Sequence, residues 1–428
     1  MGEVGWVLSL GFLVLLVLGM PIAFALGVTA VAALWVADID LVVLAQRMIA
    51  GTQTFSLLAV PCFILAGELM QVGGLSKRLV GVARAFVRHL TGGLGMVTVL
   101  SATFFAAISG SAPATTAAIG GLMIPEMEKS GYRRDFSAAL ATAAGPIGQM
   151  IPPSIPMIIW GVLAEESISR LFLAGILPGI LIAAGLMGVC YVAARRAGLQ
   201  RESRRSTARE LASAIYDGRW ALGAPVLILG GIYGGIFTPT EAAAVGVVYG
   251  LVVGLLFYRE LRLSDLPGIV IRSMRTSAMV LFIIAAASAF GWLVAIEQLP
   301  EQAAALLLSV SDNPVVILLM VNLLLLLIGA VMDNIAAMIL LGGVLTSLGA
   351  EIGMDPTQLG ALVVINFAIG MATPPFGYAL FVGAAVSKLG VEAVSKALWP
   401  FLLVEIGVLM LVTFVPDVTL AIPRWFLG

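Results

Sequence analysis

The residues SATFFAAISGSAPATTAAIGG run from Ser101 to Gly121, and AAGPIGQMIPPSIPMIIWG runs from Ala143 to Gly161. Both stretches are apolar enough for a lipid bilayer, yet small polar residues, glycine or proline interrupt each one at its centre. Interrupted helices at membrane depth are tolerated only where protein buries them or where they line a cavity. Paired interruptions of this kind indicate an ion or solute site inside a membrane protein.

The same pattern recurs 222 positions later in the chain. At this offset Ser111 aligns with Asp333, and Gly148 aligns with Gly370. The segment GQMIPPSIPMIIWG matches GMATPPFGYALFVG without a gap, and both contain a Pro-Pro pair. One register held over so many positions predicts an internal repeat of a whole structural unit.

The composition is that of a membrane protein, and it excludes several functions. Of the 428 residues, 61% are hydrophobic and 11% are charged, whereas a soluble domain averages ~25% charged residues. The net charge of -1 gives no basic surface for nucleic acid. Two cysteines and one histidine cannot build the usual catalytic metal sites, and no Walker A motif is present. We therefore expect neither an enzyme nor an organic cofactor.

The apolar segments divide into two similar halves joined by a polar linker. In each half, scaffold helices precede a helical hairpin and then an interrupted helix. The halves are expected at 1–194 and 220–428, the linker at 195–219, the hairpins at about 91–128 and 314–348, and the interrupted helices at about 136–163 and 359–387. The first hairpin's arms of ~17 residues are marginal for full spans, which favours re-entrant hairpins.

The distribution of charge supports an inverted arrangement of the two halves. If the hairpins do not cross the membrane, each half crosses five times, and this odd number turns the second half upside down. The loops assigned to the cytoplasm then hold all but three of the 23 Lys and Arg residues, as the positive-inside rule expects. A basic interfacial stretch is expected at 259–275, before a span at 277–296. We predict an all-α, multi-pass protein of two inverted repeats.

The interruptions offer two candidate sodium sites. Free N–H groups at a half-helix end suit an anion, and unwound carbonyls suit Na+. The first site is expected between hairpin and interrupted helix at Ser109, Gly110, Ser111, Gly145, Gly148 and Pro152, and the second at Gly329, Asp333, Asn334, Gly370, Thr373 and Pro374. The alternative is that these small residues only let helices pack closely.

Carboxylates within apolar segments are the other candidates. Asp333 stands out, because an intramembrane carboxylate is costly and usually functional. Glu68, Glu241 and Glu405 are expected at or near the ends of spans, where solvent reaches them. Glu241 follows Thr238 and Pro239, so it is also a candidate for the N-terminal charge of a helix.

Four motifs in this order resemble one transporter family. They are AAISGSAPATTAAIGG (106–121), GQMIPPSIPMIIWG (148–161), FTPTEAAAVGVVYG (237–250) and GMATPPFGYALFVG (370–383). They resemble the large membrane subunit of tripartite ATP-independent periplasmic (TRAP) transporters. The resemblance implies an elevator-type secondary transporter in the bacterial inner membrane, driven by two or more Na+ ions. It also implies an organic-acid solute, such as a dicarboxylate or sialic acid.

The resemblance also implies partners and a solute site. A small membrane subunit, expected as a separate chain, would widen the scaffold, and a periplasmic binding protein would deliver the solute. The solute would lie between the two hairpin tips, near Ser111, Thr115, Gln149, Pro153, Asn334 and Pro375. The chain departs from the family at Ala112-Pro113, where serine, alanine or threonine is common. The alternative within transport is a self-sufficient Na+/dicarboxylate symporter of related fold.

Overall fold

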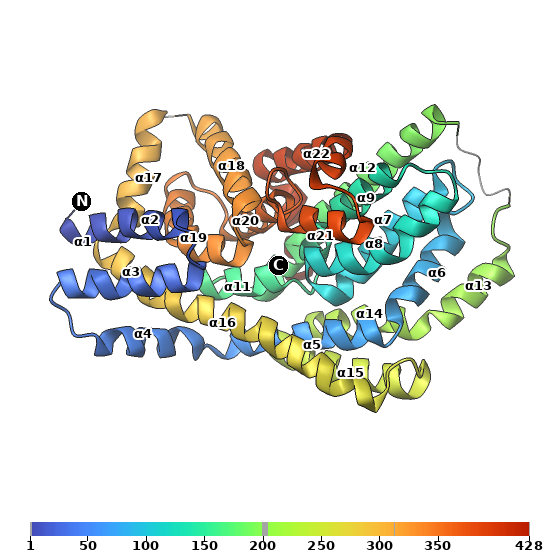
Figure 1. The fold of residues 1–428 in the computed structure, drawn as a ribbon, viewed down its shortest axis with the longest axis horizontal. Helices are drawn as coiled ribbons and strands as arrows, with labels where there is room; N and C mark the ends of the chain where they lie inside the picture. Colours follow the sequence, from blue (N-terminus) through green and yellow to red (C-terminus); the bar gives the residue numbers. More distant parts are fainter. Residues whose placement is uncertain (1, 199–203, 312, 428) are drawn as a thin grey trace.

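The protein is an arrangement of helices around two interrupted segments (Figure 1). The computed structural model describes residues 2–198, 204–311 and 313–427, and these contain no β-strand. The helices of the first half are α1 (Glu3–Trp6), α2 (Phe12–Val17), α3 (Ile22–Val36), α4 (Val42–Thr52), α5 (Ala59–Val72), α6 (Leu75–Val87), α7 (Gly93–Ser109), α8 (Ala112–Lys129), α9 (Arg134–Ala144), α10 (Ile147–Met150), α11 (Ile155–Leu163) and α12 (Ile168–Arg196).

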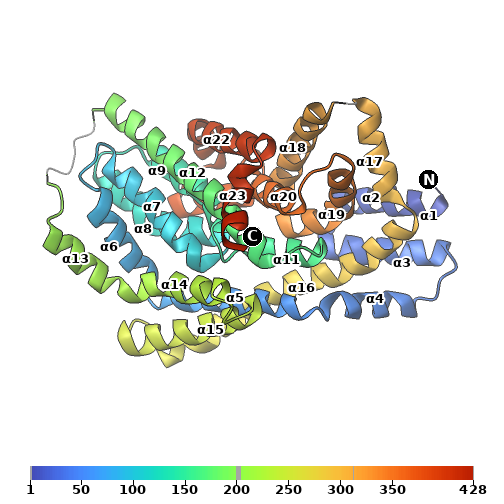
Figure 2. The same ribbon diagram turned by 180° about the vertical axis from the view of Figure 1, so that it is seen from behind.

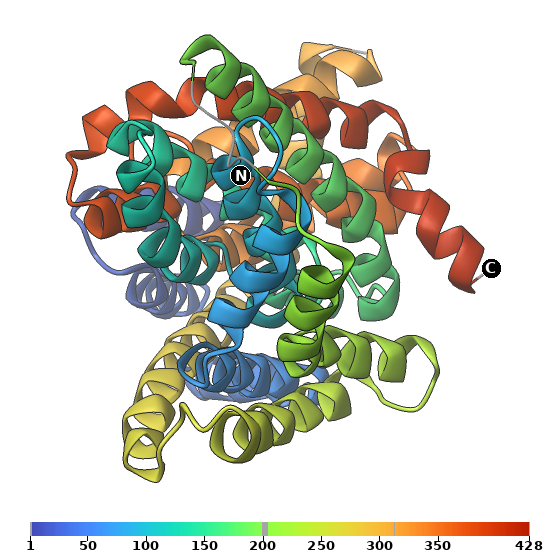
Figure 3. The same cartoon turned by 90° about the vertical axis from the view of Figure 1, so that its right-hand side faces the viewer.

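The remaining helices begin within the expected linker. They are α13 (Ala208–Asp217), α14 (Arg219–Tyr233), α15 (Pro239–Val252), α16 (Leu266–Ile296), α17 (Leu299–Val310), α18 (Pro314–Val331), α19 (Asn334–Glu351), α20 (Pro356–Gly370), α21 (Tyr378–Ser387), α22 (Val391–Phe414) and α23 (Asp417–Leu427). The expected linker falls partly on 199–203, which lie outside the described residues. Its second part is helix α13, which packs on α6, and α23 ends at the outer side of the molecule (Figure 3).

Many helices are long and apolar enough to cross a membrane. Within the described ranges, seven helices meet that test, or eight if the bent pair of α9–α10 and α11 is one span, with a bend of 43°. Both helices of the second hairpin, α18 and α19, are among the seven. Length and composition therefore do not by themselves distinguish a re-entrant second hairpin from two full spans.

One layer of helices forms a scaffold along one side of the molecule. The long helix α16 packs against α3, α4 and α5, and α5 in turn packs against α15 (Figure 1; Figure 2). Helix α16 is continuous from Leu266, so most of the stretch expected at 259–275 forms one helix with the span expected at 277–296, and Arg272 and Arg275 are exposed on it. Pro267 in the first turn favours a helix start there, and arginine is a good helix former. The interfacial position of this stretch stays a prediction.

The two interrupted helices pack crosswise on the two hairpins. The end of the first interrupted helix, α11, contacts α19 and α20 of the second half. The end of the second interrupted helix, α21, contacts α8 and α9 of the first half. Each half therefore completes the surroundings of the other half's hairpin. The first interruption is buried, whereas Pro375 and Phe376 of the second are exposed.

Two of the expected span-end carboxylates have different surroundings in the structure. Glu241 starts α15 in a capping box, in which the Thr238 backbone N–H donates to Glu241 Oε2 at 2.8 Å. Glu405, in contrast, lies in the middle of α22 with 0% exposure. Neither oxygen of Glu405 has a hydrogen-bond partner among the described residues. The expectation of a solvated Glu405 was wrong because α22 extends a further eight residues before Trp399.

Candidate functional site

The first hairpin turns at Gly110. Helix α7 ends at Ser109, Gly110 takes a left-handed conformation with φ of 61°, and Ser111 is the N-cap of α8. Glycine adopts this conformation without the steric cost that a Cβ adds. The hydroxyls of Ser109 and Thr115 lie 2.8 Å apart, and the Ala114 N–H donates to Ser111 Oγ at 3.5 Å. The tip is thus a tight turn lined by hydroxyl groups.

The first interruption rests directly on this tip. The Ile155 N–H, just after the break, donates to the Gly110 carbonyl at 3.4 Å. A Cβ at Gly148 would lie 2.7 Å from the Ser111 carbonyl oxygen and would overlap Thr115 Oγ1. A Cβ at Gly145 would overlap the hydroxyl of Thr116. Glycine at both positions therefore lets the interrupted backbone approach the hairpin closely.

The second hairpin has a carboxylate at the position that Ser111 occupies in the first. Asp333 is the N-cap of α19, and its Oδ1 accepts from the N–H groups of Ile335 at 2.9 Å and Ala336 at 3.4 Å. A Cβ at Gly370 would lie 2.9 Å from Gly329 Cα, so these two glycines are in contact. The Asp333 carboxylate therefore has a structural role as well, because it stabilises the N-terminus of α19.

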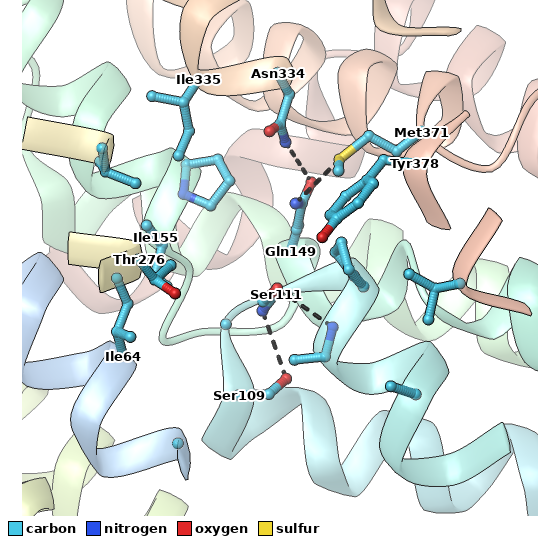
Figure 4. Close-up of a pocket in the computed structure, with 18 of the residues that line it drawn as sticks. Ile64, Ser109, Ser111, Gln149, Ile155, Thr276, Asn334, Ile335, Met371 and Tyr378 are labelled. Atoms are coloured by element: carbon cyan, nitrogen blue, oxygen red, sulfur yellow. Dashed lines mark hydrogen bonds between the residues drawn. The ribbon is translucent and has the colours of Figure 1, made fainter. Parts of the chain in front are cut away.

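The two halves meet at a pair of buried amides. Asn334 Nδ2 donates to Gln149 Oε1 at 2.8 Å, and Gln149 Nε2 donates to Met371 Sδ at 3.5 Å (Figure 4). Gln149 is only 3% exposed and Asn334 only 2%. The side chain of Gln149 thus joins the second hairpin to the first interruption.

A cavity of about 400 Å³ lies between the tips and the scaffold. The predicted residues that line it are Ser109, Gly110, Ser111, Gln149, Asp333 and Asn334. The predicted residues outside its lining are Thr115, Gly145, Gly148, Pro152, Pro153, Gly329, Gly370, Thr373, Pro374 and Pro375. Of these, Thr373 donates its hydroxyl proton to the Ile369 carbonyl at 2.8 Å. The cavity therefore joins the two tips, and most of the other predicted residues pack behind them.

The scaffold contributes a wall that the sequence reasoning missed. Glu68 and Gln71 of α5 and Thr276 of α16 line the cavity, as does Tyr378 at the start of α21 (Figure 4). Tyr378 lies in the repeated motif, which was a usable signal. Gln71 and Thr276 carry no such signal, and Glu68 was a candidate only as a carboxylate near the end of a span, because only packing brings α5 and α16 to the tips. Within 2–198, 204–311 and 313–427, no lysine, arginine or histidine lines the cavity, whereas two carboxylates do.

The site does not have the donor set of a transition metal or zinc centre. Among the described residues, no group of three or more His, Cys, Asp or Glu side chains is placed to hold a metal ion. The cavity instead offers hydroxyls, amides and one capping carboxylate near two helix N-termini. This arrangement can bind a small polar solute by hydrogen bonds and hold weakly coordinated cations.

The family model for the tripartite ATP-independent periplasmic transporter, DctM component, matches residues 9–418. The chain belongs to this family. The DctM-family relatives include the isethionate TRAP transporter permease DctMQ of Oleidesulfovibrio alaskensis, at 42% identity over 97% of the chain. The chain spans 65% of that longer relative. The sialic acid TRAP transporter large permease SiaM of Vibrio cholerae is 39% identical, with 98% of each protein covered.

Two solved transporter structures share the fold of this DctM-family chain. The YdaH transporter of Alcanivorax borkumensis superposes with a TM-score of 0.64 at 17% identity, covering 90% of this chain and 88% of that one. The MtrF structure of Neisseria gonorrhoeae gives a TM-score of 0.60 at 17% identity, with 89% and 86% covered. At this identity the likeness concerns the fold alone.

Proposed function

We propose that this multi-pass TRAP large subunit imports an organic anion across the bacterial inner membrane, coupled to Na+ and by an elevator movement. The observation that carries the proposal is the cavity lined by both hairpin tips, where Asn334 of the second tip bonds Gln149 of the first interruption. Its hydroxyls, amides and helix N-termini suit a small anionic solute. The relatives named for isethionate, C4-dicarboxylate and sialic acid all concern organic acids.

An inverted repeat accounts for the crosswise packing. If two halves are related by a two-fold axis, each contact between them occurs twice. An element of the first half that contacts an element of the second half has a counterpart in the second half that makes the same contact with the first half. The contact of α11 with α19 and α20 corresponds to that of α21 with α8 and α9. This reciprocity supports a two-fold relationship between halves at 1–194 and 220–428. The opposite orientation of the halves, with two re-entrant hairpins in the moving part, is proposed from the odd number of crossings and the distribution of Lys and Arg.

We assign the two sodium sites to the hairpin tips and the interruptions that contact them. At the first, Ser109 and Ser111 supply hydroxyl oxygens next to the break that contains Gly145, Gly148 and Pro152. At the second, Gly329 contacts Gly370 of the break that also contains Thr373 and Pro374, and Asp333 and Asn334 lie at the tip of the same hairpin. Interrupted backbone of this kind binds Na+ through its carbonyls in other transporters.

The proposed partners follow from the tripartite family. A periplasmic binding protein delivers the solute, and a small membrane subunit completes the scaffold as a separate chain. The additional length of the DctMQ relative is consistent with a small subunit joined to that protein. Exposed apolar side chains on α14 and α15, such as Val226 and Val248, give lipid or a subunit an apolar surface.

Reconstitution tests the function. The chain, the small subunit from its gene neighbourhood and a candidate binding protein are placed in liposomes, and uptake of isethionate, succinate and sialic acid is followed with and without a Na+ gradient. We expect uptake of one organic acid that requires both the gradient and the binding protein. Uptake by this chain alone would favour a self-sufficient Na+/dicarboxylate symporter, and Na+-independent uptake would contradict the coupling.

A further inference from the structure

The ion pair of Arg272 and Glu68 lies at the scaffold side of the cavity. Arg272 Nε is 3.1 Å from Glu68 Oε2, although the residues are 204 positions apart in the chain. Glu68 lines the cavity, and so does Thr276, one turn after Arg272 on α16. The hydroxyl of Thr276 donates to the Arg272 carbonyl at 3.2 Å. The guanidinium is therefore placed just outside a cavity to whose lining the described part of the chain contributes no lysine, arginine or histidine.

The pair is also close to the first hairpin tip. A Cβ at Gly67, the neighbour of Glu68, would lie 3.7 Å from Ser109 Cα, which is ordinary van der Waals contact. Both charged side chains are partly exposed, Arg272 at 55% and Glu68 at 33%. Ion pairs with this exposure are worth little in free energy, so another anion can replace the carboxylate at small cost.

We propose that Arg272 is a second anion-binding station at the mouth of the cavity, and that Glu68 competes with the solute for it. This proposal rests on the proposed transport of an organic anion. A carboxylate or sulfonate that leaves the tips displaces Glu68 from Arg272 and pairs with the guanidinium. When Glu68 re-forms the pair, it expels the anion, so the station passes the solute on without trapping it. Arginine suits this role because its planar donors match carboxylate and sulfonate oxygens.

Thiol labelling tests the station without knowledge of the solute. In a background with Cys62→Ala and Cys190→Ala, Thr276→Cys gives one thiol beside Arg272. The thiol is modified by an anionic, sulfonate-bearing methanethiosulfonate and, separately, by a cationic, trimethylammonium-bearing one. The measurement is the rate with the anionic reagent divided by the rate with the cationic reagent. Glu68→Gln should raise this ratio roughly fivefold, because Arg272 is then unpaired, and Arg272→Gln should lower it by a similar factor.

Matched controls make the outcome decisive. Glu392→Gln breaks an exposed pair with Lys396 elsewhere and should leave the ratio unchanged. Arg272→Lys keeps the charge and should keep the wild-type ratio. In the Glu68→Gln background, sodium isethionate at about 10 mM should slow modification of the thiol more than sodium chloride does at the same ionic strength. The proposal that Arg272 binds the anion would be wrong if the ratio of modification rates were equal in Glu68→Gln, Arg272→Gln and wild type. It would also be wrong if isethionate gave no protection. If the ratios change as expected but the reconstituted complex takes up no solute, the result would instead contradict the proposed transport function.

Discussion

Gln149 Nε2 lies 3.5 Å from Met371 Sδ, and the two residues are 222 positions apart, the offset that aligns the two Pro-Pro motifs. Corresponding residues of two copies related by a two-fold axis can touch only near that axis. The contact therefore supports an axis that passes beside Gln149, between the two interruptions. The proposed inverted repeat thus places the amide pair and the cavity at the centre of the protein.

The Gln149–Asn334 hydrogen bond should be energetically coupled. Gln149→Ala leaves the buried Asn334 amide without an acceptor, which should cost about 1–3 kcal/mol of stability. The double variant with Asn334→Ala should lose less than the sum of the two single variants. Thermal unfolding in detergent measures all three, and Gln53→Ala, at an exposed glutamine, is the control. Strict additivity would show that the two amides act independently.

Gly148 should tolerate no side chain. Gly148→Ala places a Cβ 2.7 Å from the Ser111 carbonyl oxygen, so the tip and the break must separate. We expect a loss of roughly 1–3 kcal/mol and a large loss of uptake. Gly121→Ala is the matched control, because nothing lies within 4 Å of its Cβ position. That control should be neutral or gain about 0.5–1 kcal/mol, and an equally stable Gly148→Ala would refute the close contact.

Asp333 should have two separable roles, as an N-cap and as a sodium ligand. Asp333→Ala removes both, with a loss of about 1 kcal/mol from the cap alone. Asp333→Ser keeps a capping oxygen, as Ser111 does in the first half, but removes the charge. We expect Asp333→Ser to unfold near the wild-type temperature and yet to need more Na+ for half-maximal uptake. An unchanged Na+ requirement in Asp333→Ser would leave Asp333 with the capping role only.

The buried carboxyl group of Glu405 should make the protein less stable than an apolar side chain at the same position would. Its carboxyl oxygens are buried without partners among the described residues, and such groups are costly to desolvate. Glu405→Leu should therefore raise the free energy of unfolding by about 1–3 kcal/mol, seen as a higher melting temperature in detergent. Glu392→Leu, at an exposed position of the same helix, should change stability by less than about 0.5 kcal/mol. A lower melting temperature for Glu405→Leu would reveal that Glu405 binds a group in the native protein.

The backbone interruptions were predictable because their causes are local. Gly110 and the Pro-Pro pairs set the backbone conformation within a few residues, whatever packs around them. Ser111 and Asp333 are residue types that favour the N-cap position, so the starts of α8 and α19 were also accessible from the chain. The repeat offset then linked the two interruptions without any knowledge of packing.

The sequence by itself determined that two matching apolar segments are each interrupted and that the chain belongs to the DctM family of TRAP transporters. Only the tertiary structure decided which polar groups meet: Gln149 with Asn334, Glu68 with Arg272, and Glu405 with none among the described residues. The physical reason is that lipid-facing and protein-facing surfaces of a membrane helix are both apolar. Hydropathy therefore cannot tell which side of a helix is buried, and helix packing alone brings distant residues together.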